Sequence, residues 1–324
     1  MKDLRKVGIG IIGLGGVGQK VLQTFARHPQ AEVRAVCDTD VALLARTKAM
    51  GNDLFASTQY EDVLAHDQVD LIYIAVPPKY HYPIVMSAIA KQKHILCEKP
   101  LANSLEEAED MLRGAADSKI VHAMNFPTFF RPSYREFSRC LQERRIGELR
   151  RVEVTLNFPV WPRAWQQNAW IGSREQGGFV REVLPHFIQL ILAEFGDLRQ
   201  IASSLEYPAD TQLCETGILA LLELDRQVPV LITGMSGAAA AEHVALTAIG
   251  THGTASLTNW SQFLYAASGE PLAPVELAET DHLYAMVDGV IQSVLGHTSV
   301  VVNFATGYKV QRILEGLRGS GALR

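Results

Sequence analysis

Residues 7–18 read VGIGIIGLGGVG, an apolar stretch that runs directly into a glycine-rich turn. A strand, the spacing G-x-G-x-x-G and a following helix together form the fingerprint of a dinucleotide-binding fold. Gly13 suits the tight turn, Gly15 lets the backbone approach a pyrophosphate, and Gly18 lets the helix pack closely on its strand. The sequence therefore predicts a bound dinucleotide at this turn.

The residues after the turn indicate which dinucleotide is bound. A helix is expected to begin at Gly16, so Gly16 and Val17 are predicted to bind the pyrophosphate at the helix N-terminus, where unpaired N–H groups favour an anion. The next expected strand ends at Asp38, a position from which a carboxylate accepts hydrogen bonds from an adenine ribose. Because no adjacent arginine could bind a 2′-phosphate, the sequence favours NAD over NADP.

Composition limits the class of protein. With 324 residues, 48% of them hydrophobic, the chain is long enough for two domains with their own cores. The net charge of −5 argues against nucleic acid as a partner, and no apolar run reaches the length of a membrane span. The four cysteines are dispersed without a CxxC pair, so we expect no metal site. The first apolar stretch lacks the cleavage site of a signal peptide, which predicts a cytoplasmic location.

The pattern of apolar segments predicts two domains. Residues 1–123 alternate short strands with helices, which is typical of a Rossmann domain with a parallel α/β sheet. Residues 124–324 contain longer alternating segments, which predict an α+β domain with a large, mainly antiparallel open sheet. The expected strands are Val7–Ile12, Glu32–Cys37, Val69–Val76, His94–Cys97, Ile120–Met124, Arg150–Phe158, Arg199–Leu205, Gly217–Leu224, Val228–Met235 and His243–Gly250. The expected later helices are Phe179–Phe195, His282–Leu295 and 303–317, the last of which is expected to pack back on the first domain.

Pro77, Pro78 and His81 follow the predicted strand 69–76. Ligands of open α/β sheets bind beyond the carboxyl ends of the strands, so these residues are predicted to line the cofactor site. The alternative is that the paired prolines only stiffen a turn.

Glu98 and Lys99 follow the predicted strand 94–97. A lysine at such a position needs Glu98 or a ligand as its partner, because an unpaired buried charge is costly. Beside a cationic oxidised nicotinamide the pKa of Lys99 would fall, which suits a role in acid–base chemistry. The alternative is an ordinary solvated ion pair.

Glu182 and His186 are four residues apart at the start of a predicted helix, so they share one helical face. A carboxylate beside an imidazole selects its tautomer, which makes His186 a candidate general base. Pro185 complicates this prediction, since a proline inside a helix removes a backbone hydrogen bond.

Together these segments make the chain resemble the Gfo/Idh/MocA family of oxidoreductases. The resemblance rests on GLGGVG at 13–18, AVPPKYHYPIVMSAI at 75–89, EKPLANSLEEAEDM at 98–111 and GGFVREVLPH at 177–186. It extends to the C-terminal segment NFATGYKVQRILEGLRGSG at 303–321 and so covers essentially the whole length. The EKP motif is the most specific of these segments.

The resemblance implies an NAD(P)-dependent dehydrogenase or reductase that acts on a sugar, cyclitol or related hydroxyl or carbonyl compound. In the family, the lysine that maps to Lys99 contacts the reacting hydroxyl, and the histidine that maps to His186 takes its proton. The family aspartate four residues before this histidine is here Glu182, so the pair is kept with one extra methylene.

Other departures from the family concern the substrate. Gln189 replaces a frequent second aspartate, and the arginine-rich start of the second domain reads MNFPTFFRP, which includes Asn125. These changes suggest a less polar pocket than that of a typical sugar dehydrogenase. The region that borders the substrate in the family contains tryptophans that can stack on a ring and arginines that can bind a carboxylate. The candidate substrate-binding residues are Asn125, Trp161, Arg163, Trp165 and Arg181.

Two other functions remain open. A non-catalytic NAD-binding regulator would keep the glycines but has no need of Lys99 and His186. An NAD-dependent glycosidase of the same fold would keep them all. The open sheet of the second domain also predicts a homodimer or homotetramer, because extended apolar sheet faces mark interfaces.

Overall fold

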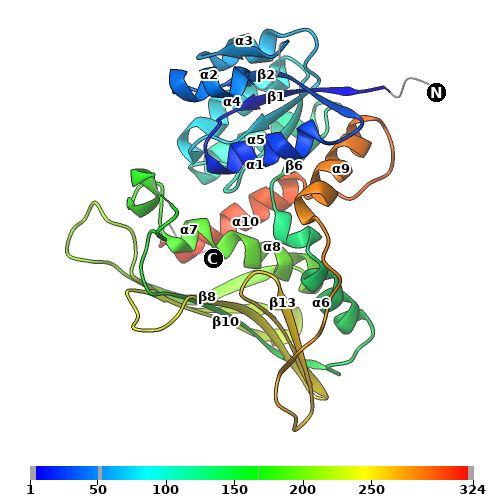
Figure 1. Ribbon diagram of the computed structural model, residues 1–324. Coiled ribbons are helices and arrows are strands. Elements are labelled where there is room, and N and C mark those ends of the chain that lie inside the picture. Colours follow the sequence, from blue (N-terminus) through cyan, green and yellow to red (C-terminus); the bar gives the residue numbers. More distant parts are fainter. Residues whose placement is uncertain (1–4, 50–52, 167, 320–324) are drawn as a thin grey trace. The chain divides into compact units, whose positions relative to one another are not determined.

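The computed structural model of the chain describes residues 5–49, 53–166 and 168–319 (Figure 1). The chain divides into two compact units. Unit 1 consists of Met1–Pro127 and Asp281–Tyr308, and unit 2 consists of Thr128–Thr280 and Lys309–Arg324. Unit 1 thus contains helix α9 (His282–Val294), which the sequence pattern did not assign to it.

Unit 1 is a doubly wound parallel sheet. Its strand order among the described residues is β3-β2-β1-β4-β5-β6, so the order reverses beside β1, the strand that precedes the glycine turn. The strands are β1 (Val7–Ile12), β2 (Ala31–Cys37), β3 (Phe55–Ser57), β4 (Leu71–Ile74), β5 (His94–Cys97) and β6 (His122–Met124). All residues of β1 and β4 are buried, which explains their continuous apolar sequences. Ligands of such sheets bind at the reversal point, where the glycine turn lies.

The helices of unit 1 begin in two ways, some at a side-chain cap and others, such as the one at Gly16, without one. Ser104 accepts a hydrogen bond from the main-chain N–H of Glu107 (3.2 Å) and so caps the start of α5 (Leu105–Ala116). The Glu107 carboxylate accepts from the N–H of Asn103, one residue before the cap. These helices are α1 (Gly16–Ala26), α2 (Val41–Lys48), α3 (Tyr60–Ala65), α4 (His81–Ala90) and α5 (Leu105–Ala116), besides α9.

Unit 2 contains a large, mainly antiparallel sheet. Its order among the described residues is β14-β13-β12-β11-β7-β10-β9-β8, and only the β7–β10 pair among these neighbours is parallel. The strands are β7 (Leu149–Phe158), β8 (Leu198–Glu206), β9 (Gly217–Leu224), β10 (Pro229–Ser236), β11 (His243–Gly250), β12 (Gly253–Thr258), β13 (Gln262–Ala267) and β14 (Ala273–Pro274). In β9 the alternate residues Ile218, Ala220 and Leu222 are buried, so this face of the sheet forms the core.

The helices of unit 2 differ from the prediction near the candidate residues Glu182 and His186. The expected helix 179–195 is two helices, α7 (Phe179–Glu182) and α8 (Leu184–Phe195), which meet at Val183. Pro185 explains the break, because it has no N–H to donate and its ring collides with the carbonyl four residues before it. Helix α6 (Pro132–Gln142) was not predicted, and α10 (Phe304–Leu317) begins in unit 1 and ends in unit 2.

Candidate active site

The first and last glycines of the fingerprint are required by the fold. Gly13 has φ +98°, a conformation that side-chain-bearing residues rarely adopt, and a Cβ there would lie 2.3 Å from the carbonyl oxygen of Ala75. A Cβ on Gly18 would lie 2.1 Å from the carbonyl oxygen of Gly13. Both glycines therefore let β1, the turn and α1 approach one another closely.

Gly15 and Gly16 have a different environment. A Cβ on either residue would meet no heavy atom of the described protein within 4 Å, apart from its own chain neighbours and helix backbone. Gly15 also has ordinary backbone angles, φ −61° and ψ −176°. The protein itself therefore does not require glycine at these positions. The space in front of the N-terminus of α1, beside the exposed Val17, fits the backbone approach of a pyrophosphate.

Asp38 joins the end of β2 to the glycine turn. Its Oδ2 accepts a hydrogen bond from the N–H of Leu14 (2.7 Å), and its Oδ1 accepts from the N–H of Asp40 (2.9 Å). A carboxylate has about four acceptor positions, so two remain for other donors such as ribose hydroxyls. Asp38 thus orients the turn and still carries acceptor capacity for a ligand.

A buried hydrogen-bond network lies at the carboxyl ends of β4, β5 and β6. The hydroxyl of Tyr73 donates to Oε1 of Glu98 (2.6 Å), and the amide of Asn125 donates to the same oxygen and to the Tyr73 hydroxyl (3.2 Å). Burial, followed by the charge of Glu98, raises the pKa of Tyr73 well above its ordinary value, so the phenol stays protonated. The network fixes the Glu98 carboxylate directly before Lys99.

Asn125 is buried within this network, and its Oδ1 has no hydrogen-bond partner among the described residues. Its contacts with Glu98 and Tyr73 were not predicted. Contact of Asn125 with a substrate stays a prediction, as does contact of Glu98 with the cofactor.

His81 connects the two loops on either side of this network. It is fully buried, with Nε2 2.9 Å from the carbonyl oxygen of Val76 and Nδ1 3.0 Å from that of Pro100. Burial is the main cause that lowers the pKa of His81, and the nearby charge of Lys99 acts in the same direction. The ring therefore holds the turn after β4 against the segment that follows Lys99.

The remaining predicted residues of these two loops are more exposed. Pro77 and Lys99 are half-buried, while Pro78 is buried as the first residue of a short 3₁₀ helix (Pro78–Tyr80). Just before Lys99 the backbone is held by hydrogen bonds from Glu98 N to Ile74 O (3.0 Å) and from Asn125 N to Cys97 O (2.7 Å), and just after it the carbonyl oxygen of Pro100 lies 3.0 Å from Nδ1 of His81. Lys99 thus lies on a well-supported loop, with its side chain partly open to solvent.

In unit 2, His186 lies in the first turn of α8. Its Nδ1 is 3.2 Å from the hydroxyl oxygen of Thr128, and its ring meets the indole of Trp260 edge-on, with ring centres 6.0 Å apart. Glu182 is the last residue of α7, on the other side of the Val183 break. The continuous helix that suggested the Glu182–His186 pair is therefore absent over these described residues, and the pair stays a prediction.

Arg163 is surrounded by aromatic rings of unit 2. Its guanidinium carbon lies 4.9 Å from the ring centre of Trp165, 5.3 Å from that of Trp161 and 5.5 Å from that of Trp260. Glu242 provides a counter-charge at 3.4 Å. Burial lowers the pKa of Arg163, although an arginine stays charged in spite of such a shift.

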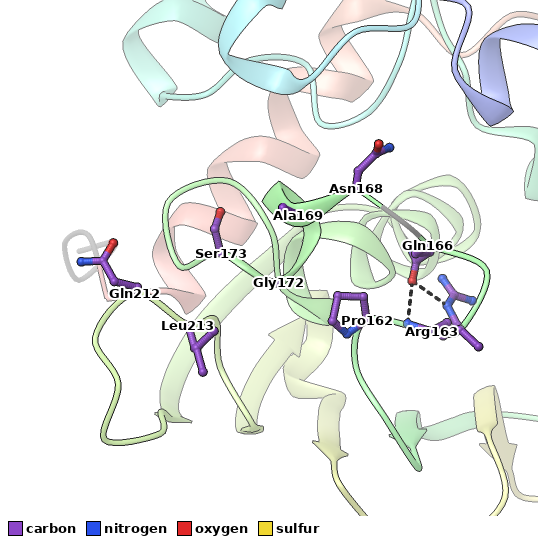
Figure 2. A pocket seen from close by; sticks show the side chains of 10 residues that line it. Pro162, Arg163, Gln166, Asn168, Ala169, Gly172, Ser173, Gln212 and Leu213 are labelled. Atoms are coloured by element: carbon purple, nitrogen blue, oxygen red, sulfur yellow. Dashed lines mark hydrogen bonds between the residues drawn. The ribbon is translucent and has the colours of Figure 1, made fainter.

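A cavity of about 600 Å³ lies beside Arg163 (Figure 2). Amide side chains line much of it, and one of them, Gln166, accepts hydrogen bonds from the main-chain N and from Nε of Arg163, both at 3.2 Å. Trp165 is 64% exposed, whereas the Trp161 indole donates to the carbonyl oxygen of Ile171 (3.2 Å). Further polar lining residues are Asn168, Ser173 and Gln212.

Arg181 has a more enclosed position than the prediction assumed. It is 3% exposed and donates to the carbonyl oxygen of Glu175, and its other terminal nitrogen lies 3.5 Å from the carboxylate of Glu315. Burial is the main cause that lowers the pKa of Arg181. These contacts suit a structural role at the start of α7, and substrate binding by Arg181 stays a prediction.

Sequence reasoning missed Thr128, Tyr73, Glu242 and Trp260, which contact predicted residues. No spacing rule connects them, because each reaches its partner only through the fold.

The described residues contain no group of three or more His, Cys, Asp and Glu arranged to hold a metal ion. None of their helices has the length and apolar composition needed to cross a bilayer.

Comparison with known proteins agrees with this arrangement. Residues 7–126 match the model of the GFO_IDH_MocA oxidoreductase family with an NAD-binding Rossmann fold, and residues 134–256 match the GFO/IDH/MocA C-terminal domain. Inositol 2-dehydrogenase of Corynebacterium glutamicum is 27% identical over 236 residues, which are 71% of this chain and 66% of that protein.

Two solved structures share the fold. Levoglucosan dehydrogenase in complex with NADH aligns with a TM-score of 0.86 at 17% identity, over 98% of this chain and 97% of that chain. A 3-ketoreductase from Actinomadura kijaniata in complex with NADP and TDP-benzene aligns with a TM-score of 0.85 at 20% identity, over 97% of both chains. Together the two family matches span residues 7–126 and 134–256, more than half of the chain. The chain therefore belongs to the Gfo/Idh/MocA family and is an NAD(P)-dependent oxidoreductase.

Proposed function

We propose that this protein transfers hydride between a nicotinamide dinucleotide and the hydroxyl or carbonyl carbon of a sugar, a cyclitol or a related small cyclic compound. The observation that carries the proposal is the supported position of Lys99. It follows a Glu98 carboxylate that Tyr73 and Asn125 hold in place, at the carboxyl edge of a sheet whose glycine turn leaves space for a pyrophosphate. The bound cofactor supplies the hydride acceptor or donor.

We assign the binding of the cofactor to residues of unit 1. The turn from Gly13 to Gly18 would hold the pyrophosphate, with Gly15, Gly16 and Val17 nearest to it. Asp38 would accept hydrogen bonds from the adenine ribose while it holds Leu14. Pro77, Pro78 and Glu98 would line the nicotinamide side, and His81 would support them from the interior.

Proton handling is assigned to Lys99 and His186. Lys99 would donate a hydrogen bond to the reacting oxygen, which stabilises the developing alkoxide. His186 would take the proton of the hydroxyl during oxidation. If the Thr128 hydroxyl accepts from Nδ1, that nitrogen carries the ring proton and Nε2 is the basic one. Glu182 would stabilise the imidazolium that forms.

Substrate recognition is assigned to the cavity of unit 2. Arg163, which lines this cavity, offers a charged donor, and Trp161 and Trp165 offer ring surfaces beside its guanidinium. Amide side chains such as Gln166 suit neutral hydroxyl groups, which fits a sugar or cyclitol better than a fatty or aromatic alcohol.

The function is tested by turnover of defined probes. We expect the wild-type protein to reduce NAD in the presence of inositol, levoglucosan or a related polyol. Lys99→Ala and His186→Ala should each lower kcat by at least about 100-fold, because positioned acid–base groups contribute on this order. NADH affinity should stay near the wild-type value in both variants. Near-normal turnover in either variant would contradict the role of that residue.

Cofactor preference needs a separate test. The stripped protein is titrated with NADH and with NADPH, and quenching of tryptophan fluorescence is followed. We expect tighter NADH binding, because the charge of Asp38 repels a 2′-phosphate, and Asp38→Asn should weaken this preference. Tighter binding of NADPH by the wild type would contradict the proposal.

The same assays separate the alternatives. A glycosidase of this fold would cleave a glycoside with no net change in NADH, and a regulator would bind NADH without turnover of any probe.

We further propose a cytoplasmic location. The four cysteines of the chain are free and buried, which supports this location because reduced thiols suit a reducing compartment; they are Cys37, Cys97, Cys140 and Cys214.

A further inference from the structure

The hairpin turn between β12 and β13 has an unusual backbone. Asn259 has φ 48° and Trp260 has φ 70°, so two consecutive residues lie in the left-handed region. Turns whose two central residues both have positive φ favour the sequence Asn-Gly. Asn259 suits its position, but a bulky side chain with positive φ is a genuine outlier. The fold alone would favour glycine at position 260.

The contacts of the Trp260 indole give a reason for this backbone conformation. Its Nε1 donates to Oε1 of Glu242 (3.3 Å), and its ring packs on Phe187 with centres 5.8 Å apart. The guanidinium of Arg163 lies over the same ring at 5.5 Å. The indole also meets the imidazole of His186 at an interplanar angle of 87°. Trp260 therefore connects the Arg163 cavity with the histidine.

His186 is consequently held from two directions within unit 2. Thr128 binds its Nδ1 at 3.2 Å, and the indole of Trp260 lies against its ring. A hydrogen bond selects the tautomer of an imidazole, and a perpendicular ring restricts rotation of its plane. Both properties matter for proton transfer, since a misplacement of about 1 Å can cost about 100-fold in rate.

We propose that Trp260 is a positioning residue for His186, and that the unfavourable backbone conformation of the turn is kept for this role. Strained residues persist where the surrounding structure holds them and where they serve function. The inference rests on the proposed role of His186 in proton transfer. A residue that only filled space beside Phe187 would not need to contact the imidazole.

The test compares three variants of the full-length protein with NAD and inositol as probes. Trp260→Gly removes the indole and relieves the backbone, so the thermal midpoint should stay close to that of the wild type while kcat falls by about 10-fold or more. Trp260→Phe keeps a ring and should restore most of kcat. Asn259→Gly is the matched control, because it relieves the same turn without a contact to His186, and its kcat should equal that of the wild type. NADH affinity should be unchanged in all three.

A second readout does not depend on turnover. The ¹⁵N shifts of the two His186 ring nitrogens report the tautomer, with His186→Gln used for assignment. We expect one tautomer in the wild type and in Trp260→Phe, and averaged shifts in Trp260→Gly. Trp260→Asn, which also tolerates positive φ, replaces Trp260→Gly if that variant does not fold.

Unchanged shifts and unchanged kcat in Trp260→Gly would overturn the inference. A wild-type protein that turns over none of the polyol probes, with His186 shifts that respond to Trp260→Gly, would count against the proposed function and support the positioning of His186. The two failures are therefore distinguishable.

Discussion

The glycines of the turn after β1 differ in what requires them. Gly13 and Gly18 meet main-chain oxygens at distances that exclude a Cβ, so the protein fold needs them. Gly15 meets no described neighbour and has backbone angles open to any residue, so only an external ligand gives a reason for its small size. At the scale of single residues, the glycines that the fold requires can thus be told apart from the glycine that a bound ligand requires.

This difference predicts opposite results for two substitutions. Gly15→Val should keep the thermal midpoint near the wild-type value and lower NADH affinity by about 100-fold or more, because the added methyl groups occupy the space of a pyrophosphate. Gly13→Ala should instead destabilise the protein by more than about 1 kcal/mol, since its φ is positive and its Cβ collides with Ala75. Thermal unfolding and fluorescence titration measure the two effects. Normal NADH binding by a folded Gly15→Val protein would contradict our placement of the cofactor.

At the scale of elements, half-buried histidines join the strands of unit 1 to their neighbours. His94 begins β5, and its Nδ1 accepts a hydrogen bond from the N–H of Val121 (2.8 Å) before β6. His122 begins β6 and accepts from the N–H of Phe304 (3.3 Å) in the same way. Burial lowers the pKa of both residues, so the folded unit favours neutral imidazoles that accept hydrogen bonds.

These histidines predict how stability depends on pH. The pKa of His94 is lower in the folded state than its ordinary value of 6.5, so the unfolded chain binds the proton first. The contribution of His94 is therefore fully present above pH 6.5 and is lost as the pH falls towards the folded pKa. His94→Gln keeps an acceptor for Val121 but does not titrate. Its thermal midpoint should fall less than that of the wild type between about pH 7 and about pH 5. If the thermal midpoints of the two proteins fell equally over this pH range, this role of His94 would be ruled out.

At the scale of the whole molecule, unit 1 is completed by a distant part of the chain, Asp281–Tyr308. The N–H of Met124 in β6 donates to the carbonyl oxygen of Val302 (2.7 Å), so residues near the C-terminus extend the edge of unit 1. The sheet of unit 2 has one apolar core face and a second face with exposed apolar residues. Leu219 and Met235 lie on this second face, because they pair across β9 and β10 with Thr233 and Gly217.

We propose that this face associates with a second copy of the chain. Leu219 is 65% exposed and Met235 is 51% exposed. Apolar side chains that lie together on a surface and stay this exposed to water mark an interaction site. Light scattering after size exclusion should give a dimer or tetramer for the wild type. Leu219→Glu combined with Met235→Glu should shift it to a smaller species with the same circular dichroism. A monomeric wild type would refute the proposal.

Local sequence signals predicted many elements of both units. The bounds predicted for β1, β5, β9 and β11 are confirmed to the residue. Their signals are local, namely apolar runs, alternation and turn residues. Strands β12 and β13 were missed, and the strand predicted at 69–76 is only Leu71–Ile74, because the chain turns at Ala75 to contact Gly13. Element ends depend on such tertiary contacts more than element cores do.

The sequence by itself determined the glycine turn, Asp38 and the EKP segment, because these depend on backbone freedom and spacing within a short stretch. Only the tertiary structure decided the partners of these residues. Tyr73, Glu98 and Asn125 meet because the parallel strands β4, β5 and β6 end at one edge of the sheet. In the same way, only the hairpin turn after β12 brings Trp260 to His186. Contacts between residues far apart in sequence depend on the packing of elements, which no local pattern records.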